Sequence, residues 1–281
     1  MNFKKDLPLT SSHWGTYRAK VKDGKVKELI GWENDKDPSP IGQGIVDVHN
    51  HQTRIDSPMI RKSWMDKGPG SNNSLRGTDP FISISWDEAE KIVSNELNRV
   101  KNDFGNASIF GGSYGWASAG RFHHAQSQLH RFLNCIGGYT RSKFTYSFAA
   151  AEAMVPHILG SYRAFLDTCT SWDSIEENTK LFICFGGVPL KNGQIAQGGT
   201  GSHKQKEKLI RSANAGIKFI NFSPLKSDLL DEVNGEWLAL RPNTDVAIML
   251  GLAHTLYKEK LYDDKFIEKY TEGFDTFLPY L

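Results

Sequence analysis

Short apolar strands alternate with helices in the second half of the chain, and this alternation constrains the fold more than any other feature. Residues 181–185 form an apolar run of the buried-strand type that leads into a Gly-Gly pair. Residues 204–213 have helical spacing, and residues 219–221 form the next strand. A strand, a helix and a second strand in this order are typical of a parallel sheet covered by helices. The sequence therefore predicts the α/β fold class.

A similar unit precedes this one. Residues 107–110 predict a strand, residues 111–120 form a loop rich in glycine and serine, and residues 121–135 predict a helix. Further helices are predicted over residues 148–159 and 245–258. We therefore expect α/β structure on both sides of the middle of the chain.

The first part of the chain has the pattern of a small β module. Residues 14–32 alternate in polarity, and Asp23-Gly24 supplies the tight turn of a hairpin. Residues 31–80 are dominated by Gly, Pro, Asn and Asp, so we expect a long irregular covering stretch. Long ordered loops usually serve a site.

A short strand over residues 81–84 is followed by a helix that ends near Gly105. Ser85 and Glu88 have the spacing of a capping box, in which each side chain accepts a hydrogen bond from the backbone N–H of the other. This pattern predicts that the helix begins directly after Ser85.

Charge and hydropathy exclude several classes of protein. The 34 Lys and Arg residues nearly balance the 32 Asp and Glu residues, so bulk charge predicts no nucleic-acid partner. The longest apolar stretches, such as residues 246–253, are far shorter than the ~20 residues of a membrane span. No signal peptide is visible at the start. We expect no membrane insertion and a cytoplasmic protein, or a periplasmic one if the N-terminus was trimmed.

The cysteines give no metal motif. Cys135, Cys169 and Cys184 form no C-x-x-C pair, so a thiolate-bound zinc ion or iron–sulfur cluster is not expected. Cys135 and Cys184 each lie in an apolar run, where we expect small core residues.

Two histidines offer an alternative metal site. His49 and His51 end an apolar run as an H-x-H pair, which looks like the first-strand zinc motif of amidohydrolase barrels. Such a barrel needs a repeating strand–helix order directly afterwards, and residues 52–80 lack it. Two polar loop histidines are the preferred interpretation, and a zinc amidohydrolase is kept as an alternative function.

The glycine loop contains two large aromatic residues, Tyr114 and Trp116. The loop matches neither the dinucleotide-binding nor the P-loop pattern. It is either an ordinary strand-to-helix turn or a loop that points Tyr114 and Trp116 into a ligand cavity, where their O–H and N–H groups can act as donors.

Several ordered blocks resemble the molybdopterin oxidoreductases of the dimethyl sulfoxide reductase family. The likeness is greatest to its S- and N-oxide reductase branch, which includes trimethylamine N-oxide, dimethyl sulfoxide and biotin sulfoxide reductases. The blocks that carry the resemblance are residues 12–15, 57–61, 84–89, 112–116, 118–120, 137–139, 146–151 and 243–245.

The resemblance implies a molybdenum centre held by two molybdopterin guanine dinucleotides, with no iron–sulfur cluster and with electrons from an external reductase or cytochrome. Ser147 matches the serine that ligates molybdenum, and a hard oxygen donor suits a high-valent metal. The alternative for Ser147 is the N-cap of the following helix. Tyr114 and Trp116 match the catalytic pair that lines the oxo position, and Trp116 also adjoins the cofactor.

The resemblance also implies contacts to the dinucleotides. Lys191 matches a lysine beside the pterins, and Asn243 and Asp245 match positions that read guanosine. Lys191 as a solvated loop residue, and Asp245 as a partner of its helix N-terminus, remain open. Ser223 and Pro224 lie where the commoner family form has Asp before the proline.

We therefore expect reduction of S-oxides or N-oxides, such as dimethyl sulfoxide, trimethylamine N-oxide, biotin sulfoxide or methionine sulfoxide, by oxygen-atom transfer. The expected domains are a β module over residues 1–50, an α/β segment with the metal-site loop over 51–160, and a Rossmann-like domain for one dinucleotide over 161–281. Members of this branch are far longer, so we expect an N-terminal fragment that lacks the C-terminal part of the fold. An inactive truncated remnant of the reductase fold is the other alternative.

Overall fold

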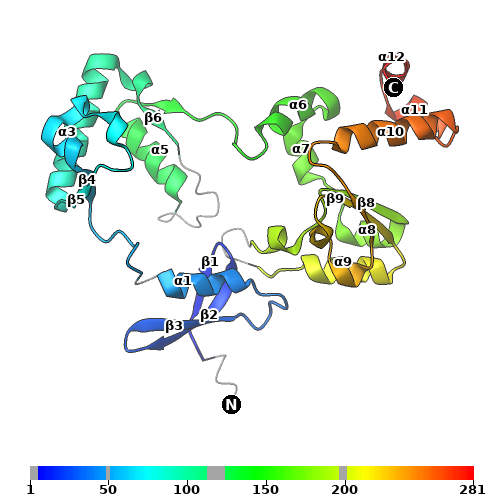
Figure 1. The fold of residues 1–281 in the computed structure, drawn as a ribbon, viewed down its shortest axis with the longest axis horizontal. Coiled ribbons are helices and arrows are strands. Elements are labelled where there is room, and N and C mark those ends of the chain that lie inside the picture. Colours follow the sequence, from blue (N-terminus) through cyan, green and yellow to red (C-terminus); the bar gives the residue numbers. More distant parts are fainter. Residues whose placement is uncertain (1–5, 49–50, 113–123, 196–200) are drawn as a thin grey trace. The chain divides into compact units, whose positions relative to one another are not determined.

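The computed structural model describes residues 6–48, 51–112, 124–195 and 201–281 (Figure 1). The chain divides into two compact units. The first comprises residues 1–168 and 195–202, and the second comprises residues 169–194 and 203–281.

The first unit begins with an antiparallel sheet in the order β1-β2-β3. Its strands are β1 (Leu9–Ser12), β2 (Gly15–Lys22) and β3 (Lys25–Gly31). Asp23 and Gly24 both have positive φ, as a two-residue hairpin turn requires. The predicted hairpin and β module are confirmed, whereas β1 was not predicted.

A small core forms on one face of this sheet. Tyr17, Ala19 and Leu29 are buried there, with Trp14 and Val46 packed against them. The Tyr17 hydroxyl donates to the carbonyl oxygens of Trp14, at 3.0 Å, and Ser39, at 2.8 Å. Val46 belongs to α1 (Gln43–Val48), so the segment after the hairpin closes the core of the β module.

The described part of the stretch expected to be irregular contains two α-helices and a strand, besides three short 3-10 turns, so it is more regular than expected. The two helices are α1 and α2 (Lys62–Lys67), and the strand is β4 (Met59–Arg61). β4 pairs antiparallel with β5 (Phe81–Ser83). Such short elements depend on distant partners for their stability and leave no periodic signal in the sequence.

The helix after β5 follows its prediction. α3 (Trp86–Phe104) has Ser85 as its N-cap, and both hydrogen bonds of the capping box with Glu88 are present. The backbone and the hydroxyl of Ser85 hold the pKa of Glu88 below its ordinary value. The cap thus fixes where the helix begins.

The rest of the first unit contains a parallel pair, β6 (Phe110–Gly111) and β7 (Thr140–Arg141). The expected strand over residues 107–110 is shifted, because a 3-10 turn occupies Asn106–Ser108. The unit also contains helices α5 (Ala125–Cys135), α6 (Ala149–Leu159) and α7 (Tyr162–Asp167).

The expectation for Cys135 was wrong. Leu133 is the buried residue of α5, whereas Cys135 at the end of the helix is exposed. Cys184 is buried as expected, and burial raises the pKa of its thiol to about 11.

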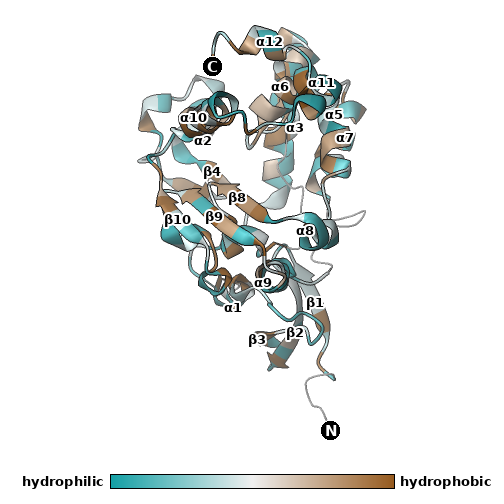
Figure 2. Cartoon of the chain, turned by 90° about the vertical axis from the view of Figure 1, so that its right-hand side faces the viewer, coloured by the Kyte–Doolittle hydropathy of each residue, from teal (hydrophilic) through white to brown (hydrophobic). Residues whose placement is uncertain are grey.

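The second unit is built on a parallel sheet in the order β10-β9-β8. Its strands are β8 (Leu181–Phe185), β9 (Lys218–Ser223) and β10 (Glu236–Ala239). Figure 2 shows hydrophobic residues along β8 and β9. The predicted strand–helix–strand order is confirmed, since α9 (Gln205–Asn214) lies between β8 and β9 in the chain.

The core of this unit lies between the sheet and α9. Leu209 of α9 is completely buried and belongs to one cluster with Cys184 of β8 and Phe219 of β9. The remaining helices are α8 (Trp172–Asn178), α10 (Asp245–Lys258), α11 (Asp264–Tyr270) and α12 (Phe274–Phe277). None of the helices in the described ranges is long and apolar enough to cross a membrane.

Candidate functional site: the carboxyl edge of a parallel sheet

The carboxyl ends of three parallel strands meet at one edge of the second unit. Lys191 follows β8 in the chain, Ser223 ends β9 and Pro224 comes next, and Asn243 and Asp245 follow β10. These five residues therefore come from strand ends, the loops after them and the first turn of the following helix. Ligands of open α/β sheets bind outside this edge.

The loops after β8 and β9 are in close contact. The N–H of Val188 donates to the carbonyl oxygen of Asp228 at 2.7 Å. Gly187 has φ +78°, and a Cβ atom there would lie 2.3 Å from the same carbonyl oxygen. A side chain cannot fit at this distance, so Gly187 allows the two backbones to meet.

Asp228 joins these two loops through its side chain as well. The Ser223 hydroxyl is fully buried and donates to Oδ2 of Asp228. Oδ1 of Asp228 lies 3.8 Å from the ammonium nitrogen of Lys191, whose side chain is 70% exposed. The hydroxyl of Ser223 therefore faces Asp228, and the charge of Lys191 reaches the surface beside it.

The loop after β10 ends at the first turn of α10. Asn243 has the left-handed backbone conformation and is exposed. Thr244 is the N-cap residue but makes no side-chain cap bond, and its hydroxyl donates to the carbonyl oxygen of Arg241 instead. Asp245 is the first residue of α10, where a carboxylate interacts favourably with the helix dipole. This position supports the helix role for Asp245 and leaves its carboxylate half-buried at the edge.

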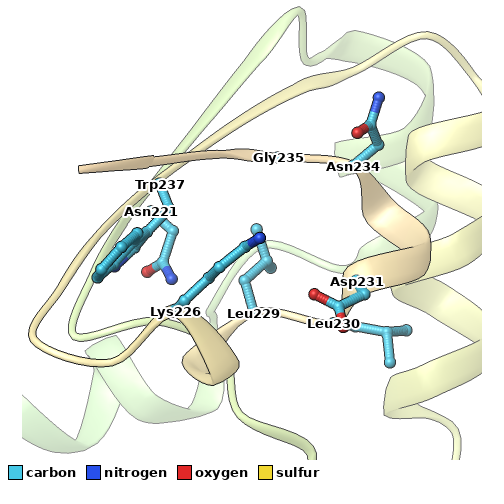
Figure 3. A pocket seen from close by; sticks show the side chains of 8 residues that line it. All are labelled: Asn221, Lys226, Leu229, Leu230, Asp231, Asn234, Gly235 and Trp237. Carbon is cyan, nitrogen blue, oxygen red and sulfur yellow. The ribbon is translucent and has the colours of Figure 1, made fainter. Parts of the chain in front are cut away.

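A cavity of about 340 Å³ lies under the connection between β9 and β10 (Figure 3). It is lined by Asn221, Lys226, Leu229, Leu230, Asp231, Asn234, Gly235 and Trp237. Asn221 is 1% exposed, and neither polar atom of its amide has a hydrogen-bond partner in the structure. The indole N–H of Trp237 donates to the carbonyl oxygen of Ser223 at 2.9 Å. A buried amide lacking partners is costly, so this cavity offers space for polar molecules that can satisfy it.

Sequence reasoning missed Asn221 and Asp228. Asn221 could have been found as a polar residue on the apolar face of a buried strand. Asp228 gave no signal of this kind, because its contacts depend on how the two loops meet.

Ser147 belongs to the first unit and lies two residues before α6. Its N–H donates to the Thr145 hydroxyl at 3.3 Å, and the N–H of Thr145 donates to Glu152 of α6 at 3.0 Å. The N-cap of α6 is Phe148, not Ser147, so the capping alternative for Ser147 was wrong. The loop before α6 is thus tied to the first turns of the helix.

Tyr114, Trp116 and His49 lie outside the described residues. His51 is exposed, and its Nδ1 atom is 2.8 Å from the Thr53 hydroxyl. Within the described ranges, no three His, Cys, Asp or Glu side chains lie together in a way that could hold a metal ion.

Comparison with protein families gives two matches that together cover most of the chain. Residues 54–276 match the molybdopterin oxidoreductase family, and residues 10–48 match the molybdopterin oxidoreductase N-terminal domain.

Curated relatives agree with these matches. The chain is 38% identical over 273 residues to a dimethyl sulfoxide/trimethylamine N-oxide reductase of Rhodobacter capsulatus, covering 97% of this chain and 33% of the relative. It is 40% identical over 248 residues to a biotin sulfoxide reductase of Cereibacter sphaeroides, covering 88% and 33%. A trimethylamine-N-oxide reductase of Haemophilus influenzae is 35% identical over 273 residues, covering 97% and 33%. The chain thus spans about a third of the length of these relatives.

The matches do not favour an amidohydrolase built on His49 and His51. They run from the β module to the last helices, and the α/β architecture of the second unit agrees with them. The chain belongs to the molybdopterin oxidoreductase family.

Proposed function

We propose that the whole protein reduces S-oxides or N-oxides by oxygen-atom transfer at a molybdenum centre held by two molybdopterin guanine dinucleotides. The observation that carries the proposal is the similarity, over 97% of this chain, to reductases named for dimethyl sulfoxide and trimethylamine N-oxide. When bound, the molybdenum centre supplies the two-electron chemistry, and an external reductase or cytochrome supplies the electrons.

The carboxyl edge of the parallel sheet carries polar side chains that can bind a phosphate and a guanine base. The Lys191 ammonium group is exposed beside the β8 end and can pair with a phosphate oxygen. The carboxylate of Asp245 can accept from the N–H donors on a guanine edge, and the neighbouring Asn243 offers an amide for the same base. This edge thus fits one of the two dinucleotides, with Ser223 and Pro224 forming the wall at the end of β9.

Metal ligation and substrate contact are assigned to the first unit. Ser147 supplies the oxygen ligand to molybdenum from the loop that Thr145 ties to α6. Tyr114 and Trp116 donate hydrogen bonds to the oxygen of the bound oxide, which polarises its S–O or N–O bond. In this arrangement the protein orients the oxide and stabilises the charge that develops on its oxygen.

Metal and nucleotide analysis of the full-length gene product tests the proposal. We expect one molybdenum and two guanine nucleotides per chain, together with oxidation of a reduced viologen dye that depends on added dimethyl sulfoxide or trimethylamine N-oxide. Zinc in place of molybdenum would favour the amidohydrolase alternative. A folded protein without metal or nucleotide would favour the inactive remnant.

A further inference from the structure

Asp228 lies between two of the residues assigned to the dinucleotide. It ends the 3-10 turn Lys226–Asp228, directly after the loop that leaves β9. One carboxylate oxygen accepts from the buried Ser223 hydroxyl, and the other lies 3.8 Å from the Lys191 ammonium nitrogen. A single side chain therefore links the end of β9 to the loop after β8.

The two side chains of this link differ in burial, and the difference shows which of them is held in place. The side chain of Asp228 is 13% exposed, whereas that of Lys191 is 70% exposed. A carboxylate in this position is stabilised by its fixed hydrogen bond from Ser223, so it is the anchored partner and the lysine is the one that it restrains. A long lysine side chain free in solvent has many rotamers, and each must be given up when it binds a phosphate.

The backbone of Asp228 restrains the same loop. Its carbonyl oxygen accepts from the N–H of Val188, and Gly187 brings the two backbones together. Side chain and main chain thus act on a segment of a few residues that carries Lys191.

We propose that Asp228 is a positioning residue that holds the Lys191 ammonium group in place for a phosphate of the guanine dinucleotide. The proposal rests on the proposed function of the carboxyl edge. Asp228 does not touch the nucleotide; it acts through Lys191, with Ser223 fixing the carboxylate from the other side.

The opposite effect of Asp228 is also physically reasonable, which makes the proposal testable. A carboxylate beside a lysine lowers the local positive potential and competes with a phosphate for the ammonium group. If competition outweighs positioning, removal of the carboxylate charge will tighten nucleotide binding. If positioning outweighs competition, removal will weaken it.

The test measures binding of guanosine 5′-diphosphate to the 281-residue chain by isothermal titration calorimetry. We expect Lys191→Gln to weaken binding about tenfold, the scale of one charge-assisted contact. Asp228→Ala should weaken it nearly as much, and the double variant should be no weaker than Lys191→Gln alone, because both changes remove the same contact. Ser223→Ala should give a smaller loss, since it frees the carboxylate without removing it.

Asp231→Asn is the matched control. Asp231 lines a second cavity together with Lys191 and Asp228, and Asp231→Asn removes the same charge as Asp228→Asn, but no contact between the Asp231 side chain and Lys191 is observed in the described structure. We expect Asp231→Asn to bind with wild-type affinity and Asp228→Asn to bind more weakly. Asp228→Asn keeps the shape of the side chain, so it serves as the test if Asp228→Ala disturbs folding. Tighter binding in Asp228→Asn, or losses that add in the double variant, would overturn the proposal.

Hydrogen exchange gives a second measurement that needs no ligand. Asp228→Ala should increase amide exchange about tenfold at Val188 and in residues 190–193, while Asp231→Asn leaves it unchanged. If the wild-type chain shows no saturable binding of guanosine 5′-diphosphate, the proposed function of the edge fails. The positioning role of Asp228 then stands or falls on exchange in this loop alone.

Discussion

The contact between Gly187 and Asp228 gives a sharp prediction for a single methyl group. Gly187 has φ +78°, and a Cβ atom there would lie 2.3 Å from the Asp228 carbonyl oxygen and 2.5 Å from its Cβ. Gly186 has almost the same φ, +82°, but nothing lies within 4 Å of its added Cβ. Gly187→Ala and Gly186→Ala therefore share the backbone strain and differ only in the clash.

The magnitudes follow from this difference. Left-handed backbone at a residue with a side chain costs about 1 kcal/mol, so we expect Gly186→Ala to lower the free energy of unfolding by that amount. Gly187→Ala adds an overpacking cost of about 1–3 kcal/mol, because the neighbouring atoms are backbone and must shift. We expect a total loss of about 2–4 kcal/mol, and faster hydrogen exchange at Val188, whose N–H binds the displaced carbonyl.

Urea unfolding followed by circular dichroism measures both variants against the wild-type chain. Guanosine 5′-diphosphate titration adds a functional measurement, in which we expect Gly187→Ala to weaken binding more than Gly186→Ala does. Equal losses of stability in the two variants would refute the reasoning, since they would show that the approach of Asp228 to Gly187 carries no energetic consequence.

Four further predictions concern the metal site and the thiols. In the full-length protein, Ser147→Ala should retain molybdopterin, as metal analysis can show, but lose nearly all oxidation of the viologen dye. Wild-type rates would disprove ligation by Ser147. Tyr114→Phe should raise the barrier by about 2–4 kcal/mol and change the preference between dimethyl sulfoxide and trimethylamine N-oxide, and kinetics with both oxides that show no change would place its hydroxyl away from the substrate. At pH 8, iodoacetamide should modify the exposed Cys135 and Cys169 before Cys184, as mass spectrometry can show. Burial raises the pKa of the Cys184 thiol from 9.0 to about 11. The buried, protonated thiol therefore makes its full contribution to the free energy of unfolding below pH 9, and this contribution is lost as the pH rises toward 11. A free energy of unfolding that does not change between pH 9 and pH 11 would contradict this linkage.

Local signals in the sequence predicted local structure well. The Asp23-Gly24 turn and the Ser85 cap involve neighbouring residues only, and both appear in the structure as predicted. The strand–helix–strand order of the second unit was likewise predicted, because β8 is a continuous apolar run and β9 is rich in Phe and Ile.

Elements that depend on distant partners were not predicted. β4 and β10 are short strands whose existence rests on pairing with β5 and β9. Cys135 was expected in the core from its apolar neighbours, but its place at the end of α5 leaves it exposed. Position on a helix decides burial, and an apolar run does not reveal it.

The candidate site divides in the same way. The ends of β8 and β9, and therefore the residues directly after them, could be located from the sequence order, since parallel strands end at the same edge. Asn243 and Asp245 came from the family resemblance, because β10 was not predicted. The role of Asp228 could not be predicted from the sequence, because its partners Ser223 and Lys191 come from different strands and loops. The contact that joins them exists only after β8 and β9 have paired.

The indole of Trp237 gives the molecule an internal optical reporter. Its N–H is bonded to the last carbonyl of β9, and its ring borders the cavity beneath that strand end. Trp172, in contrast, stacks on Phe182 against the core. Because indole emission shifts with the polarity around the ring and with the loss of its hydrogen bond, movement of the β9 end should change the fluorescence of Trp237 and leave that of Trp172 constant. In a variant that keeps Trp237 and replaces the other six tryptophans by Phe, movement of the β9 end would then be followed in real time, with no label attached.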